Sequence, residues 1–284
     1  MNRIILFLSA LTLTFALSAQ QWKIVERGFL YEGSLPPTCH AATLVEASNG
    51  DIISVFFGGT YEGHPDSDVW MCRYKANKHK WTAPEVIADG IYTEYTRNAF
   101  EYDPLMGKIL NRDSLFVKTT WLKPTKHNGK ALVNNMVRKP CYNAVVYIAQ
   151  NGELVVDYKI GSNMQDWTGW EIRSANDGKS WTHPRPLTTD PAQRFLRLGP
   201  IKNKPIVNNG RIIAGSSTEI TYDSWKVHFE ISDDDGKTWQ KSEVECDTIL
   251  CIQPAILKLA DNHLKALCRT RHHLISETES FDNG

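Results

Sequence analysis

The sequence predicts an all-β protein built from repeated four-stranded sheets. Short runs of β-branched and aromatic residues alternate with turn signals such as Asn49-Gly50 and Asn209-Gly210, which is typical of antiparallel strands joined by tight turns. One eight-residue motif begins at Ser174, returns at Ser232 and begins again at Ser280. These spacings suit one four-stranded sheet per repeat. No segment shows the sustained 3.6-residue period of an amphipathic helix.

Strands are expected where apolar and β-branched residues gather, at 41–45, 51–57, 144–148, 153–158, 211–214, 226–230 and 255–259. The region from about 92 to 137 does not fit the repeat spacing, and it contains the turn signals Lys123-Pro124 and Asn128-Gly129. We therefore predict an insertion between the first two repeats.

The repeated motif reads S-x-[DN]-x-G-x-[ST]-W, and we call it the box. Its copies are 174–181, 232–239, the beginning of a copy at 280–284, and a degenerate copy at 74–81. The Asp or Asn at the third position accepts hydrogen bonds from its own turn, the glycine takes a positive φ, and the tryptophan packs against the sheet. The box is therefore a folding device, and we predict no catalytic role for Asp233, Asp234 or Asp235.

The first 19 residues are expected to form a signal peptide. Arg3 gives a positive start, residues 4–17 are mainly apolar, and Ala16, Ser18 and Ala19 are small enough for cleavage. The apolar run is shorter than the roughly 20 residues that a membrane-spanning helix needs. We expect a periplasmic or secreted protein, with residues 20–284 as its folded domain and no integral membrane segment after cleavage.

The charge balance and the cysteines restrict the partners. Lys plus Arg and Asp plus Glu both number 32, so the net charge is zero and nothing indicates a nucleic-acid partner. The six cysteines form no C-x-x-C pair and no zinc-type spacing. The sequence therefore predicts no metal and no cofactor.

The boxes and four further stretches resemble the BNR-repeat sialidase (neuraminidase) superfamily, in particular its bacterial sialidase-like branch. The stretches are His40–Leu44 with Phe57–Gly63, Arg138–Asn143, Gly199–Pro205 with Ser217–Glu219, and Leu267–Arg271. The resemblance implies a six-bladed β-propeller with a sugar site at its axis. It also leads us to expect about four blades in this chain, the fourth unfinished at Gly284.

Sialidases of this superfamily remove terminal sialic acid with three arginines that hold the sugar carboxylate, an Asp acid/base, and a Tyr nucleophile activated by a Glu. By resemblance, Asp66 and Asp68 match the acid/base position, with Glu62 close by. Arg269 and Arg271 match an arginine that precedes a box. His40 stands where the first arginine is expected, Gln253 stands near the position of the Glu, and the tyrosine would come from a later blade. These departures favour a sugar other than sialic acid.

Other candidates come from residue pattern. Lys202 and Lys204 alternate in a strand-like segment, so both should point to one side and attract an anion; the alternative is a solvated edge. Glu219 ends a predicted strand, and beside these lysines its pKa should be lowered, which suits a nucleophile or base. We assign catalysis to Asp66, Asp68 or Glu219. The predicted substrate-binding residues are His40, Glu62, Arg138, Asn143, Lys202, Lys204, His228, Gln253, Arg269 and Arg271.

The sequence thus predicts a secreted, exo-sialidase-like glycoside hydrolase that removes a terminal acidic sugar, sialic or uronic, from a glycan. The alternative is a propeller of the same fold that binds glycan without hydrolysis, or a polysaccharide lyase.

Overall fold

The computed structural model describes residues 24, 27–33, 35–90, 139–164, 167–187, 198–219, 221, 223–245 and 248–284, and the paired short strands β6 (Lys126–His127) and β7 (Lys130–Ala131). The chain divides into two units, Met1–Leu30 and Tyr31–Gly284, and the second contains every sheet. The predicted signal peptide, Arg138, and most of the predicted insertion lie outside the described residues.

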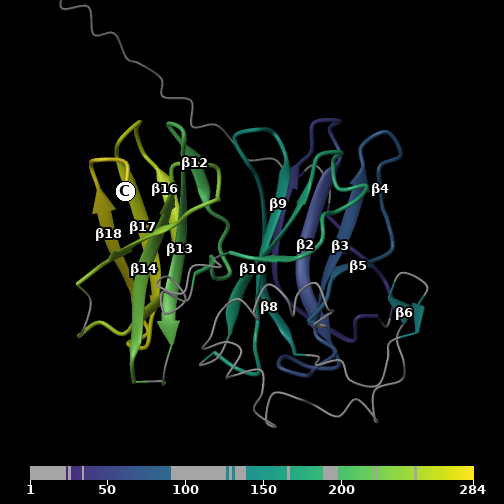
Figure 1. The fold of residues 1–284 in the computed structure, drawn as a ribbon, viewed down its shortest axis with the longest axis horizontal. Coiled ribbons are helices and arrows are strands. Elements are labelled where there is room, and N and C mark those ends of the chain that lie inside the picture. The colour runs from purple at the N-terminus through teal and green to yellow at the C-terminus, as the bar shows by residue number, and fades with distance from the viewer. Residues whose placement is uncertain are drawn as a thin grey trace, which may run out of the picture. The chain divides into compact units, whose positions relative to one another are not determined.

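Four antiparallel sheets follow one another along the chain (Figure 1), and we call them blades 1 to 4. Blade 1 contains β1 (Thr38–Glu46), β2 (Ile52–Gly59), β3 (Asp68–Lys75), β4 (Lys80–Trp81) and β5 (Glu85–Ala88). Blade 2 contains β8 (Cys141–Ile148), β9 (Leu154–Ile160), β10 (Thr168–Ser174) and β11 (Arg185–Pro186). Blade 3 contains β12 (Ile206–Asn208), β13 (Arg211–Glu219), β14 (Trp225–Ser232) and β15 (Gln240–Glu243). Blade 4 contains β16 (Cys251–Lys258), β17 (Leu264–Thr270) and β18 (Ile275–Ser280).

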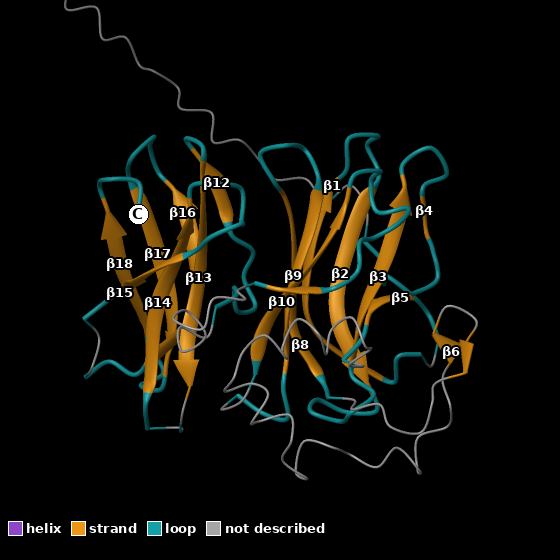
Figure 2. Ribbon diagram, in the orientation of Figure 1, coloured by secondary structure: helices purple, strands orange, loops and turns teal. Residues whose placement is uncertain are grey.

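Within each blade, strands that are neighbours in sequence pair with one another, except that β5 of blade 1 pairs with β3. The described residues form strands and loops with no helix (Figure 2). This arrangement confirms the predicted all-β propeller, with the expected number of blades in this chain. Each predicted strand overlaps an observed one, although 51–57, 153–158 and 255–259 extend one residue beyond β2, β9 and β16. The predicted ranges do not cover β3, β4, β5, β10, β11, β12, β15, β17 and β18.

The core lies between consecutive blades. Ile53 and Val55 of blade 1 pack with Val156 and Trp170 of blade 2 in one buried cluster. A second cluster joins Tyr147 and Val155 of blade 2 to Ile212, Ala214 and Trp239 of blade 3. Blade 2 therefore buries both of its faces, and this explains the almost wholly buried strands β8 and β9.

The boxes close their turns as predicted. In blade 3, the Ser232 hydroxyl accepts the Gly236 N–H at 2.8 Å, and Asp234 accepts the N–H and hydroxyl of Thr238 at 2.8 and 2.7 Å. Although burial by itself raises the pKa of Asp234, these hydrogen bonds lower it to about 2. The Ser174 and Ser280 hydroxyls accept the equivalent glycine N–H groups at 2.8 and 2.7 Å. The prediction that the box shapes a turn is confirmed.

The fourth position of each box also joins neighbouring blades. Asp177, Asp235 and Asn283 occupy this position and share left-handed φ values of 58°, 61° and 66°. Asp235 accepts a hydrogen bond from the Gln150 N–H of the preceding blade at 3.1 Å, and its carbonyl accepts one from Arg173 at 2.7 Å. Ser48 with Arg73 binds Asp177, and Asn208 with Arg211 binds Asn283, in the same manner. We call these contacts the inter-blade clamp.

Candidate functional site

The first strands of blades 1, 2 and 4 are irregular at the end away from the boxes. The pairing of β1 with β2 shifts register between His40 and Thr43, and β8 and β16 shift at equivalent places. The residues at these irregularities are left-handed: Ala41, Asn143 and Gln253, with φ of 52°, 50° and 57°, and in blade 3 Lys202, with φ of 65°. A bulge of this kind redirects the side chains around it. Predicted sugar-binding residues occupy three of these four positions: Asn143, Lys202 and Gln253.

Three predicted residues from two blades line one cavity. His40 comes from β1, and Lys202 and Lys204 come from the segment that leads into β12; Ala255 and Ile256 of β16 complete the wall. The cavity measures about 530 Å³, and none of the described residues that line it is acidic. We call it the first-strand cavity.

Hydrogen bonds between blades fix the cationic segment in this cavity. The Lys204 ammonium donates to the Leu44 carbonyl of blade 1 at 3.0 Å. The Asn203 amide donates to the Gln253 carbonyl of blade 4 at 2.9 Å. The His40 ring lies edge-on to Phe57, with ring centroids 5.6 Å apart. The cavity therefore gathers cationic side chains on a backbone that three blades hold in place, which favours an anionic ligand.

Glu219 lies elsewhere, at the end of β13 on the face toward blade 4. Its side chain is 7% exposed and accepts a hydrogen bond from the Ser217 hydroxyl at 2.9 Å. Burial raises the pKa of Glu219, although the Ser217 bond and the charges of Lys159 and Arg269 oppose this rise. The expectation of a lowered pKa beside Lys202 and Lys204 is therefore wrong, because desolvation outweighs the two cations that are actually near. A buried carboxyl of this kind is suited to donate a proton.

The two predicted arginines accompany Glu219 and do not line the first-strand cavity. The guanidinium groups of Arg269 and Arg271 lie 5.3 and 5.7 Å from the centre of the Trp225 ring system. Trp225 is the cross-strand partner of Glu219, and Arg271 also pairs with Asp223. We call this group the Glu219 cluster.

The carboxylates of blade 1 form a third group. Asp66 accepts hydrogen bonds from the N–H and hydroxyl of Thr60 at 2.9 and 2.6 Å and lies 2.6 Å from His64 Nδ1. Burial by itself raises the pKa of Asp66, but these hydrogen bonds lower it below its ordinary value. Asp66 is therefore ionised and braces its own loop. Asp68 begins β3 and is 8% exposed, and Glu62 is exposed in the loop between them and β2.

His228 is not on any surface. It is fully buried between blades 2 and 3, where its Nε2 lies 3.1 Å from Glu230 Oε1. The prediction that His228 binds the sugar does not agree with this location, because a wholly covered imidazole cannot contact a ligand in this structure.

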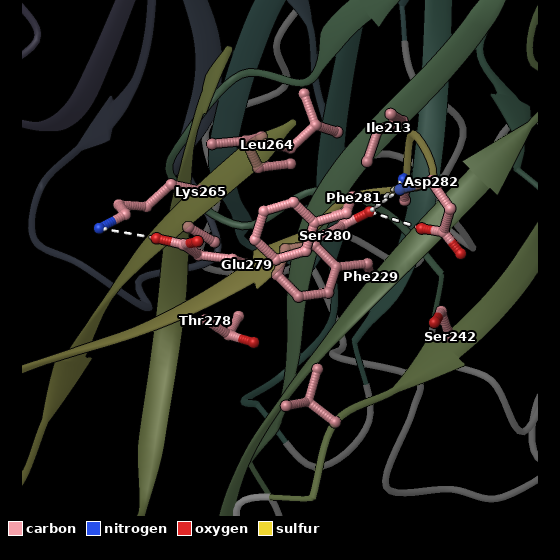
Figure 3. Close-up of a pocket in the computed structure, with 14 residues that line it drawn as sticks. Ile213, Phe229, Ser242, Leu264, Lys265, Thr278, Glu279, Ser280, Phe281 and Asp282 are labelled. Atoms are coloured by element: carbon pink, nitrogen blue, oxygen red, sulfur yellow. Dashed lines mark hydrogen bonds and ion pairs between the residues drawn. The ribbon is translucent and has the colours of Figure 1, made fainter. Parts of the chain in front are cut away.

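A second cavity of about 530 Å³ lies between blades 3 and 4, beside the last box (Figure 3). Ile213, Phe229, Leu264 and Phe281 give it an apolar lining, and no predicted site residue belongs to it. Its ionic groups include Lys265 and Glu279, which pair at 2.9 Å. The described residues contain no cluster of His, Cys, Asp and Glu that could hold a metal ion, and among them no helix could span a membrane.

Comparison with known proteins shows the family to which the chain belongs. Residues 50–284 match the model of the BNR repeat-like domain. The chain belongs to this family. No curated protein sequence matches it.

Solved structures share the fold of this BNR repeat-like protein. A protein of unknown function from Dyadobacter fermentans superposes with a TM-score of 0.56 and 16% identity, over 87% of this chain and 66% of that one. The NanB sialidase from Streptococcus pneumoniae gives 0.57 and 12%, over 90% and 52%, and the Hadza microbial sialidase Hz136 gives 0.55 and 11%, over 87% and 45%. The chain thus spans about half the length of these sialidases. At identities this low, the similarity shows a common fold and nothing more.

Sequence reasoning missed several residues of the site. Lys159 is fully buried near Glu219, and Glu230 is fully buried beside His228. Both alternate with apolar residues along β9 and β14, a pattern that normally indicates a solvated face. Only the burial of both faces of a blade reveals these charges as internal.

Proposed function

We propose that the protein is an exported glycoside hydrolase that removes a terminal acidic sugar from a glycan. The observation that carries this proposal is the first-strand cavity, which collects His40, Lys202 and Lys204 and contains no acidic residue among the described residues of its lining. Two ammonium groups in one cavity repel each other. A bound sugar carboxylate would relieve this repulsion.

The Glu219 cluster, which does not line the first-strand cavity, is proposed to supply the chemistry that hydrolysis needs. A glycosidic bond is hydrolysed when a carboxylic acid protonates the leaving oxygen and the anomeric carbon forms a new bond, either to water or to an enzyme nucleophile that water later displaces. The raised pKa of Glu219 shifts this carboxyl toward its protonated form, which suits the transfer. Asp66, whose pKa is lowered, is proposed as an ionised partner. Asp68 is proposed as a second catalytic carboxylate, since the sialidase resemblance assigns both residues to the acid/base loop. Arg269 and Arg271 would add further positive charge for the substrate.

The BNR repeat-like domain and the fold shared with two sialidases support the hydrolase class. The substrate candidates are sialic and uronic acids. The chain has His40 and Gln253 where sialidases are expected to have an arginine and a glutamate, and these departures favour the uronic acid. Export to the periplasm or outside the cell is proposed from residues 1–19.

The proposal is tested with the full chain and three fluorogenic substrates: the 4-methylumbelliferyl glycosides of N-acetylneuraminic acid, glucuronic acid and rhamnose. We expect release from an acidic glycoside and none from the neutral rhamnoside. Glu219→Gln should lower kcat about a hundredfold or more, as expected for the loss of a general acid. Glu243→Gln, which changes an exposed glutamate of β15, serves as the control.

Three outcomes would contradict the proposal. Binding of an acidic sugar without release would indicate a binding protein, and an unsaturated uronide formed from a 4-linked uronide oligosaccharide would indicate a lyase. Equal turnover of the wild type and Glu219→Gln would remove Glu219 from the mechanism.

A further inference from the structure

One short segment carries both lysines of the first-strand cavity, and it is anchored from inside the protein. The Lys159 ammonium of blade 2 donates to the Leu198 carbonyl at 2.6 Å. On the other side of the same peptide unit, the Gly199 N–H donates to Glu230 Oε2 at 2.6 Å. The Ser216 hydroxyl donates to the Gly199 carbonyl at 2.7 Å. Three side chains from two blades thus converge on one point of the backbone.

These anchors are unusual because they are fully buried. Lys159, Glu230, Ser216 and His228 each have 0% exposure. Burying charged groups is unfavourable unless they are paired, and apolar residues of similar volume would often fill such an interface with no loss of stability. The charges are therefore better explained by the peptide that they hold than by the stability of the interface.

Further contacts hold the Glu230 carboxylate in place beside the Leu198–Gly199 peptide. Glu230 lies 3.1 Å from His228 Nε2, whereas His228 Nδ1 has no hydrogen-bond partner in the structure. Burial raises the pKa of Glu230, but His228, Lys159 and the Gly199 N–H together lower it below its ordinary value. Glu230 is thus an ionised acceptor for the Gly199 N–H.

Gly199 of the anchored peptide is poorly replaced by any residue that has a Cβ. Gly199 has a φ of +116°, and a Cβ at this position would lie 3.0 Å from the Lys159 ammonium. The next residues are Pro200 and the fully buried Ile201, whose N–H donates to the Gly215 carbonyl at 3.1 Å. The left-handed Lys202 follows at once, so the place of the anchor determines where the lysines stand.

We propose that Glu230, together with Lys159 and His228, is a positioning group that holds the 198–204 segment so that Lys202 and Lys204 project into the first-strand cavity. Through this segment, Glu230 sets the preference of the cavity for an acidic sugar. The second part rests on the proposed function, whereas the positioning itself does not.

The same interface offers a matched control. Glu171 of blade 2 is also fully buried between blades 2 and 3, and it binds Arg173 and Arg185 at 2.8 and 2.7 Å. It lies toward the inter-blade clamp, and its bonds are to side chains rather than to the 198–204 segment. Glu230→Gln and Glu171→Gln therefore remove the same charge from the same interface at two different places.

The first experiment is hydrogen exchange of the full chain, read by mass spectrometry without any ligand. In Glu230→Gln, peptides that cover 198–205 should exchange about tenfold to a hundredfold faster, as expected for the loss of one charge-assisted hydrogen bond. Glu171→Gln should leave these peptides unchanged while it accelerates exchange near 171–187. Equal exchange of 198–205 in the two variants would overturn the proposal. If Glu230→Gln does not fold, His228→Asn replaces it, because this variant keeps the Glu230 carboxylate. Exchange of 198–205 in His228→Asn is again expected to be faster than in Glu171→Gln.

The second experiment compares N-acetylneuraminic acid and glucuronic acid with their methyl esters in titrations of the same variants. The ratio of acid to ester affinity should fall about tenfold in Glu230→Gln and stay constant in Glu171→Gln. An unchanged ratio in Glu230→Gln would overturn the specificity role. If the wild type binds neither acid, the proposed function fails, and the exchange experiment alone still decides whether Glu230 positions the segment.

Discussion

A backbone conformation recurs at both ends of the blades, but its side chains recur only at the box end. At the box end, equivalent positions carry similar side chains, and Ser174, Ser232 and Ser280 make the same bond. At the other end, a left-handed residue recurs in or just before the first strand of each blade, but the residue type differs each time: Ala41, Asn143, Lys202 and Gln253. The first pattern stabilises the fold, and the second offers one backbone position to four different side chains. This difference teaches where chemistry can vary without loss of the fold.

The carboxylates of the two ends differ in the same sense. Asp234 is hydrogen-bonded in its box turn, and its pKa is lowered to about 2. Glu219 is covered by the neighbouring blade, and desolvation raises its pKa. Asp234 therefore serves its turn as an ionised acceptor, whereas desolvation shifts Glu219 toward its protonated form.

The largest expected effect is at the box end. Trp239 is 1% exposed in the cluster between blades 2 and 3, so Trp239→Ala should lower the free energy of unfolding by about 3–5 kcal/mol. Trp181 is only partly buried, and Trp181→Ala should lower it less. Urea unfolding measures both, and the folded fraction should keep its turnover. Normal stability with lost turnover would refute the folding role of the boxes.

The inter-blade clamp should give a smaller effect. Asp235→Ala removes the acceptor of the Gln150 N–H and the partner of Arg173, and the expected loss is about 1.5–3 kcal/mol of unfolding free energy. The neighbouring Asp233 binds Arg211 at an exposed site, so Asp233→Ala is the control and should change stability less. Equal losses in the two variants would contradict the clamp.

The smallest effect concerns the pH dependence of stability. The pKa of Asp234 is lowered from 3.8 to about 2 in the folded state, so its contribution is present above pH 3.8 and is lost as the pH falls toward 2. Glu219 has a raised pKa, so its contribution is present below its ordinary value of 4.5 and is lost as the pH rises through its folded value. Asp234→Asn should flatten the acid limb of a plot of unfolding free energy against pH. Glu219→Gln should flatten the fall above pH 4.5, and an unchanged limb in either variant would contradict the assigned shift.

The sequence was sufficient for the repeated part of the fold, because a box is local. Ser232, Asp234 and Gly236 meet within one turn, and their spacing alone specifies the hydrogen bonds. The site was only partly predictable. Lys202 and Lys204 could be placed together from their alternation, whereas Glu219 acquires its raised pKa from burial by blade 4, which no local pattern reports.

The buried charges were beyond sequence reasoning for a related reason. Lys159 and Glu230 look like solvated residues of half-buried strands, and β10, which carries the buried Glu171, was not predicted for the same reason. Their burial depends on a second blade that covers the face. The left-handed conformation of Ala41, Asn143, Lys202 and Gln253 was not predicted because none of these residues is a glycine.

The central claim is that the first-strand cavity selects an anionic sugar, and titration calorimetry of Lys204→Ala tests it most directly. N-acetylneuraminic acid and glucuronic acid are each compared with the neutral methyl ester, and Lys237→Ala at the box end is the matched control, since Lys237 is an exposed lysine of a box. Lys204→Ala should weaken binding of the acid about tenfold to a hundredfold, the loss of one charge-assisted hydrogen bond, and should leave the ester unaffected. Equal weakening for acid and ester, or an equal effect of Lys237→Ala, would contradict the account.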